Sequence, residues 1–88
     1  MFTVHKYVIS PYGAKIEMPA NAEILTVAYQ GNDCCIWAKV DTEAEPETRQ
    51  FELFGTGHRI PRVMGVDYIY IGTGFINGLV FHAFEISN

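Results

Sequence analysis

The stretch that decides the fold is YIYIGTGFINGLVFHAFEI, which runs from Tyr68 to Ile86. Two runs rich in aromatic and β-branched residues, Tyr68–Phe75 and Leu79–Ile86, lie on either side of the pair Asn77-Gly78. Such runs favour β-strands, and Asn-Gly is the pair preferred in the type I′ turn that joins two antiparallel strands. The stretch therefore predicts a β-hairpin.

Five earlier segments have the same strand-like alternation of side chains. They are Phe2–Ile9, Ala14–Met18, Glu23–Gln30, Cys34–Asp41 and Arg49–Thr56. No window of the sequence has a convincing helical period over ten residues. About seven short strands with turn signals at near-regular spacing predict an all-β fold, either a small antiparallel β-sandwich or a partly closed barrel.

Length and composition predict one domain that associates with itself. The chain has 88 residues, so residues 1–88 form a single domain, and 49% of the residues are hydrophobic. A domain of this size buries only about 60–65% of the surface that its unfolded chain exposes. Because the hydrophobic content is high for so small a chain, we expect an additional surface to be buried in a homo-oligomer.

The charge balance excludes one class of partner. The net charge is −4, and only six residues are Lys or Arg. A protein that binds duplex nucleic acid needs a basic face that displaces counterions from phosphate, so we expect no duplex partner. No N-terminal signal pattern and no membrane-length apolar run is present, so we expect a cytoplasmic protein with no membrane partner.

The two cysteines are neighbours, Cys34 and Cys35. Neighbouring residues of a strand point to opposite faces, so these two thiols cannot easily form a disulfide with each other. We interpret them as one buried and one outward-facing thiol in a reducing compartment.

The tripeptide Gly-Thr-Gly occurs twice, at residues 55–57 and 72–74. Glycine at the end of a strand provides a bulge, bends the strand, or lets another group come close. The second copy continues into Phe75 and has no polar neighbour, so we interpret it as structural.

The first copy continues into charged residues and is the candidate ligand site. Its members are Gly55, Thr56, Gly57, His58 and Arg59, with Arg62 three positions further on. Backbone N–H groups in glycine-rich turns bind anions, and arginine recognises phosphate or carboxylate through two parallel hydrogen bonds. The pattern predicts a cradle for a small anionic ligand. The alternative is a structural loop in which His58 caps the backbone and Arg59 pairs with an acidic segment. That segment is DTEAEPET, Asp41–Thr48, which we expect to be a hydrophilic loop.

Two aromatic residues, Trp37 and Tyr68, are candidate stacking platforms for such a ligand, although core packing is the alternative for Trp37. His82 lies on an apolar strand, which favours a core or interface role. His5 could face His82 if the terminal strands pair, but no third ligand is evident, so we expect no metal or other cofactor.

Enzymatic activity is not expected. No Ser, Cys or Asp lies in a recognisable nucleophile setting, and no pair of carboxylates is embedded in apolar sequence. A nucleotide hydrolase with His58 as acid or base is the weakest alternative.

Several of these pieces together resemble a family of small uncharacterised proteins found in bacteriophage and bacterial genomes. The pieces are His5-Lys6-Tyr7, Trp37 before Val40-Asp41, Gly55-Thr56-Gly57-His58 before Ile60, Tyr70-Ile71-Gly72-Thr73, and Val80-Phe81-His82 before Phe84-Glu85. The resemblance implies a phage accessory protein. Some such proteins are anti-defence sponges that sequester a cyclic or ADP-ribose-type nucleotide used as an immune signal. The alternative is a protein–protein inhibitor or structural accessory protein that binds a host or virion protein.

Overall fold

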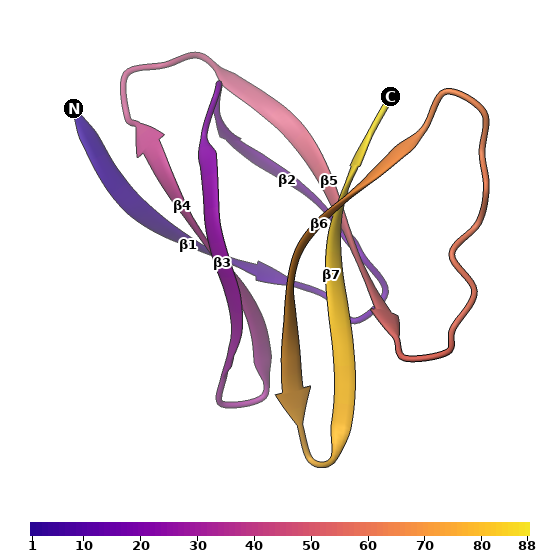
Figure 1. Cartoon of the computed structure of the whole chain (residues 1–88). Helices are drawn as coiled ribbons and strands as arrows, with labels where there is room; N and C mark the ends of the chain where they lie inside the picture. Colours follow the sequence, from indigo (N-terminus) through magenta and orange to yellow (C-terminus); the bar gives the residue numbers. More distant parts are fainter.

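The computed structural model describes residues 1–88 as seven antiparallel strands without a helix (Figure 1). The strands are β1 (Phe2–Ile9), β2 (Ala14–Pro19), β3 (Glu23–Gln30), β4 (Asp33–Asp41), β5 (Pro46–Gly55), β6 (Asp67–Ile76) and β7 (Leu79–Ser87). The all-β prediction is confirmed. With no helix, the structure contains none long and apolar enough to span a membrane.

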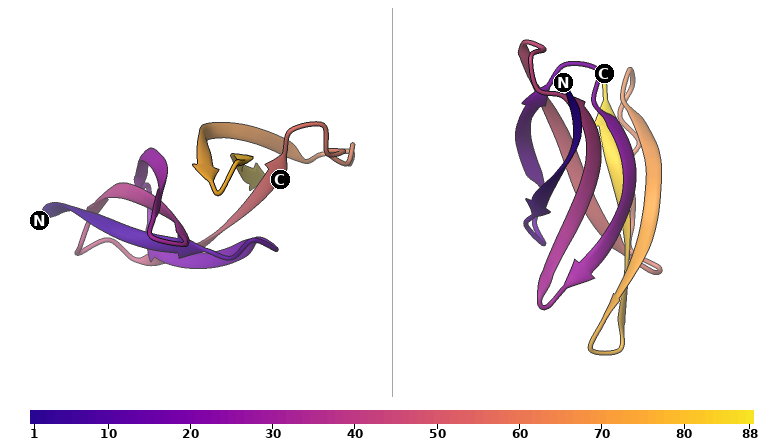
Figure 2. Two further views of the ribbon diagram at one scale, coloured as in Figure 1. Left: turned by 90° about the horizontal axis from the view of Figure 1, so that it is seen from below. Right: turned by 90° about the vertical axis from the view of Figure 1, so that its left-hand side faces the viewer.

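The strands form two sheets. The first sheet has the order β1-β4-β3, and the second sheet has the order β2-β5-β7-β6. The sheets pack against each other as a sandwich that does not close into a barrel, and strand β3 lies next to β6 (Figure 2). The predicted hairpin is the pair β6–β7, in which Ile76 lies opposite Leu79.

The core lies between the two sheets and is small. Ile36, Ala38 and Val40 alternate along β4, and all three are fully buried against residues such as Phe51 and Ala83 of the second sheet. Only 12 of the 88 residues are buried. Much of the hydrophobic composition is therefore left at the surface, where it could contact a partner.

One strand starts earlier than the sequence predicts. We expected the acidic segment before Arg49 to be a loop, but β5 begins at Pro46. Glu47 lies opposite Met18, and Thr48 lies opposite Glu17 of β2. A proline without a backbone N–H is tolerated at the first residue of a strand, so cross-strand pairing overrides the polar composition here.

The prediction of one outward-facing thiol is wrong. Cys34 and Cys35 lie on opposite faces of β4, yet their residues are only 4% and 1% exposed. Burial, with a smaller contribution from Cys35, raises the pKa of Cys34 to about 11. Both thiols are free.

The terminal strands do not pair, so the condition under which His5 could face His82 is not met. Strand β1 pairs with β4, whereas β7 lies between β5 and β6 in the other sheet. His5 and His82 therefore belong to different sheets and do not form a facing pair.

Candidate functional site

The two Gly-Thr-Gly copies lie at the same level of the second sheet, on either side of β7. His82 of β7 lies opposite Phe54 on β5 and opposite Thr73 on β6. Phe54 directly precedes the first copy, and Thr73 is the centre of the second. The sheet thus brings the two tripeptides together around one histidine.

Both imidazole nitrogens of His82 contact a threonine hydroxyl from these copies. The Nε2 atom lies 2.8 Å from Thr56 Oγ1, and the Nδ1 atom lies 2.9 Å from Thr73 Oγ1. The Tyr70 hydroxyl lies 2.6 Å from the same Thr73 oxygen. These four residues form a continuous hydrogen-bonded chain, which we call the threonine–histidine network.

The chemistry of these groups favours one direction of donation. A phenol is a better donor and a poorer acceptor than an alkyl hydroxyl, so Tyr70 donates to Thr73. Thr73 then donates to Nδ1 of His82, and the Nε2–H group of His82 donates to Thr56 Oγ1. This direction uses every donor except the hydroxyl proton of Thr56, which is free for solvent or a ligand.

The glycines of the second copy admit side chains from the opposite sheet. A Cβ atom on Gly72 would lie 2.7 Å from Val27 Cγ1, and one on Gly74 would lie 2.9 Å from the ring of Tyr29. Val27 and Tyr29 both belong to β3. The second copy is therefore structural, as predicted, and close approach of the two sheets is the reason for its glycines.

The glycines of the first copy serve the loop instead. A Cβ atom on Gly55 would lie 2.8 Å from the ring of His58, and Gly57 has a φ of +84°, where glycine is favoured. The backbone N–H of Gly55 donates to His58 Nδ1 at 3.3 Å, and the His58 N–H donates to the Gly55 carbonyl at 3.0 Å. The capping role considered for His58 is therefore observed, and it occupies one N–H of the predicted cradle.

The arginines of the loop have no acidic partner. Arg59 and Arg62 are exposed and take part in no ion pair. The alternative in which Arg59 pairs with the acidic segment is wrong, because Asp41 and Glu43 instead contact the N-terminal amine, at 3.4 and 3.3 Å.

Arg62 and Tyr68 line the same open hollow, about 530 Å³ in volume, which we call the loop hollow. Its lining consists of Ile60, Pro61, Arg62, Val63, Met64, Val66 and Tyr68. The ring of Tyr68 is supported edge-to-face by Phe54 at 6.0 Å, and Phe54 packs in the same way on Phe84 at 5.8 Å. The hollow therefore combines a free guanidinium with a firmly held aromatic ring.

The other predicted residues are distributed differently. Gly55, Thr56 and His58 line a separate hollow of about 370 Å³ beside the β6–β7 turn. Arg59 lines neither hollow. Trp37 lies half-buried on β4 of the first sheet, opposite Lys6 and Thr26, and thus on a different sheet from the loop (Figure 1).

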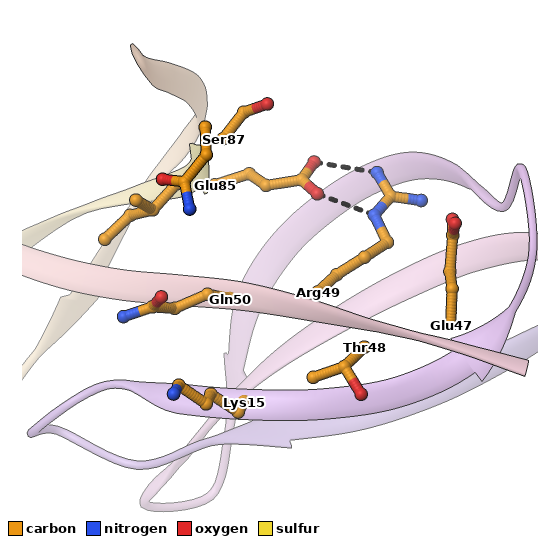
Figure 3. Close-up of a pocket in the computed structure, with 9 residues that line it drawn as sticks. Lys15, Glu47, Thr48, Arg49, Gln50, Glu85 and Ser87 are labelled. Atoms are coloured by element: carbon orange, nitrogen blue, oxygen red, sulfur yellow. Dashed lines mark hydrogen bonds and ion pairs between the residues drawn. The ribbon is translucent and has the colours of Figure 1, made fainter. Parts of the chain in front are cut away.

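A third pocket, of about 450 Å³, lies beside the ion pair between Arg49 and Glu85 (Figure 3). Arg49 donates to both Glu85 carboxylate oxygens, at 2.6 and 2.7 Å, and to the Ala22 carbonyl at 2.5 Å. The hydrogen bonds that Arg49 donates to the Glu85 carboxylate raise the pKa of Arg49 above its usual value. The pair ties β5, β7 and the segment before β3 together, so its arginine is occupied by a structural role.

Sequence reasoning missed two of these features. Arg49 alternates with Phe51 and Leu53, and an arginine on an apolar face signals a buried acidic partner. His82 was recognised only as a core or interface residue, and its threonine partners come from two other strands.

No group of three His, Cys, Asp or Glu side chains is arranged to hold a metal ion. Residues 1–88 match the model of a family described as "Domain of unknown function (DUF7352)". The match covers the whole chain, which therefore belongs to this uncharacterised family. No curated protein and no solved structure matches the chain.

Proposed function

We propose that this member of the family is a non-enzymatic binding protein that captures a small anionic ligand in the loop hollow. The observation that supports this function is the presence of Arg62, which has no carboxylate partner, beside Tyr68 in one hollow. All ion pairs in the structure involve either Arg49 or the N-terminal amine. Arg62 is therefore available to a ligand.

The chemistry of the hollow suits a nucleotide. Arg62 can hold a phosphate through two parallel hydrogen bonds, and Tyr68 can stack on a flat base. The apolar side chains of Val63 and Met64 lie in the same lining. The volume of about 530 Å³ is within the range of roughly 300–1,000 Å³ that small-molecule sites occupy.

In finer detail, the ligand we propose is a cyclic or ADP-ribose-type nucleotide that serves as an immune signal. The protein would then be a phage-type anti-defence sponge acting in the cytoplasm of the host cell. The sequence resemblance to small phage proteins supports this context, and sequestration needs only binding groups. The net charge of −4 disfavours long nucleic acids while leaving a locally basic loop for a small anion.

A thermal-shift titration with ADP-ribose and cyclic dinucleotides tests this function. A ligand at 100 times its dissociation constant adds about 2.7 kcal/mol to the free energy of unfolding, and raises the midpoint by roughly 10 °C or more. Arg62→Ala should abolish the shift, whereas Lys15→Ala, which removes a charge on β2 outside the hollow, should preserve it. Recovery of unchanged ligand after heat denaturation separates capture from hydrolysis. No shift with any of these nucleotides would refute the nucleotide proposal.

A second function is supported by the exposed apolar residues of the same loop. Val63 is 52% exposed and Met64 is 100% exposed. Methionine and arginine are enriched in the centres of protein–protein interfaces, so the loop also fits a protein–protein inhibitor or a structural accessory protein. In that case Met64→Asp should abolish capture of a host or virion protein, and nucleotides should leave the melting temperature unchanged.

A further inference from the structure

We propose that two copies of the chain associate edge to edge through β1, antiparallel to each other, so that their first sheets form one continuous sheet. Strand β1 pairs only with β4, so its other edge has no backbone partner. Three of its apolar side chains are largely exposed: Phe2 at 69%, Val4 at 52% and Val8 at 51%.

The other three edge strands each carry several features that discourage such pairing, whereas β1 carries only one, the charge of Lys6. Strand β2 is short, contains Lys15 and Glu17, and ends at Pro19. Strands β3 and β6 each contain a bulge, and their edges lie against each other where Val27 meets Gly72. Short length, charge, proline, bulges and coverage are the usual protections of a sheet edge.

Strand β1 has eight residues in unbroken register with β4, from Phe2 opposite Asp41 to Ile9 opposite Cys34. It contains no proline and no acidic residue, and its one formal charge is Lys6. A long, regular and apolar edge of this kind is a template for another strand.

The distribution of charge allows a second copy to approach the free edge of β1. Two chains that each carry a net charge of −4 repel each other, except where the contact surface is free of acidic groups. Strand β1 is such a surface, because its only charged side chain is basic. Phe2, Val4 and Val8 lie on the outer face of the first sheet, since Val4 and Val8 oppose Lys39 and Cys35 and not the core residues of β4. Pairing would bring the exposed apolar side chains of the two copies together on that face.

An antiparallel register centred on His5 is compatible with a two-fold axis between two copies of β1. With a two-fold axis through His5, Phe2 of one copy lies opposite Val8 of the other, and Val4 lies opposite Lys6. Residues that face each other in this register share the same face of the sheet, and the two lysines are not opposed. A second copy therefore fits this edge with no like charges opposed and with Phe2 of each chain beside Val8 of the other.

The proposed interface leaves the loop hollow free. Strand β1 and the loop after β5 lie at opposite ends of the molecule in Figures 1 and 2. Self-association therefore does not depend on the proposed ligand, and either proposal can fail without the other.

Sedimentation equilibrium of the full chain at about 10–100 μM tests the proposal, with charge changes at Val4 as the variants. The wild type should have twice the chain mass of 9.9 kDa. Val4→Lys places lysines opposite each other twice per dimer and should raise the dissociation constant more than about tenfold. Val4→Glu places a carboxylate opposite Lys6 and should preserve the dimer. Leu25→Lys, at an exposed apolar position on β3, is the matched control and should also preserve it.

A cysteine variant decides the register even if Val4→Lys fails to fold. Directly opposed residues of an antiparallel pair have Cα atoms roughly 4.5–5.5 Å apart, within the range of a disulfide. His5→Cys should therefore form a disulfide-linked dimer on mild oxidation, and Leu25→Cys should not. A monomeric wild type, a dimer that survives Val4→Lys, or cross-linking through Leu25→Cys instead of His5→Cys would overturn the proposal.

Discussion

The two Gly-Thr-Gly copies have the same sequence and lie beside the same histidine, but they do different things. In the second copy, Gly72 makes room for Val27 of the opposite sheet. In the first copy, Gly57 allows the chain to turn into a loop, and the Cβ position of Gly55 is covered by the ring of His58. The difference shows that a tripeptide acquires its role from the element that faces it. The following experiments test that difference.

The largest effect is expected from Gly72→Ala. The new Cβ would lie 2.7 Å from Val27 Cγ1, and Val27 is a buried, stiff β-branched residue. Overpacking of this kind costs about 2–3 kcal/mol of unfolding free energy, which urea denaturation can measure. If close approach is the cause, the double variant Val27→Ala/Gly72→Ala should lose at least about 1 kcal/mol less than the sum of the single variants.

Gly57→Ala is the matched comparison for the first copy. Nothing lies within 4 Å of the Cβ position at Gly57, so its cost comes from the φ of +84° and should be about 1–2 kcal/mol. Val27→Ala should not relieve it. Equal coupling of Val27→Ala to both glycine variants would contradict the distinction between the two copies.

The next prediction concerns the loss of unfolding free energy at alkaline pH, which depends on two residues near the second copy. Tyr29, whose ring lies against Gly74, has a pKa raised by burial and then by Cys34, and burial raises the pKa of Cys34 from 9.0 to about 11. A raised pKa means that folding favours the neutral thiol. Its stabilising effect is therefore complete below pH 9 and is lost as the pH rises from 9 to about 11.

A pKa difference between 9.0 and about 11 corresponds to about 2.7 kcal/mol, and solvent screening reduces the expected loss to about 2 kcal/mol. Urea denaturation between pH 8 and 11 measures it. Cys34→Ala should remove most of this pH dependence. A wild type with constant stability up to pH 11 would show that the thiol is accessible to water.

The fold was predictable because it depends on local patterns. Alternation along Phe2–Ile9 and Glu23–Gln30 predicted β1 and β3 with the bounds that the structure has, and Asn77-Gly78 predicted the C-terminal hairpin. The order of strands in the sheets was not predictable in the same way. Pairing of β1 with β4 joins segments about thirty residues apart, and only packing between the sheets selects it.

The candidate site was predictable only in part, because it too depends on contacts between segments far apart in the sequence. Arg62 and Tyr68 were recognised individually from their chemistry, and their common hollow depends on the path of the intervening loop. The role of His82 requires the register of three strands at once, which fixes Thr56 and Thr73 at its two nitrogens. Sequence can supply the groups, but non-local geometry decides which of them meet.

A smaller effect compares the threonines of the two copies. Thr73 is half-buried and contacts both His82 and Tyr70, whereas Thr56 is exposed. Thr73→Val should cost about 1–2 kcal/mol, because it leaves Nδ1 of the half-buried His82 without a hydrogen bond. Thr56→Val should change the unfolding free energy by less than about 0.5 kcal/mol, because water can replace the lost partner. Equal costs in urea denaturation would mean that the two hydroxyls are equally important to the fold.

The subtlest test concerns the proton on His82. If donation runs from Tyr70 through Thr73, the neutral ring carries its proton on Nε2, and long-range ¹H–¹⁵N NMR at about pH 8 should detect that tautomer. Thr73→Val should shift the population toward the Nδ1–H form, whereas Thr56→Val should leave it unchanged. An Nδ1–H tautomer in the wild type would reverse the direction of the whole network. Thr56 would then donate to His82 and present only lone pairs outward, which would repel an anion at the first copy instead of binding it.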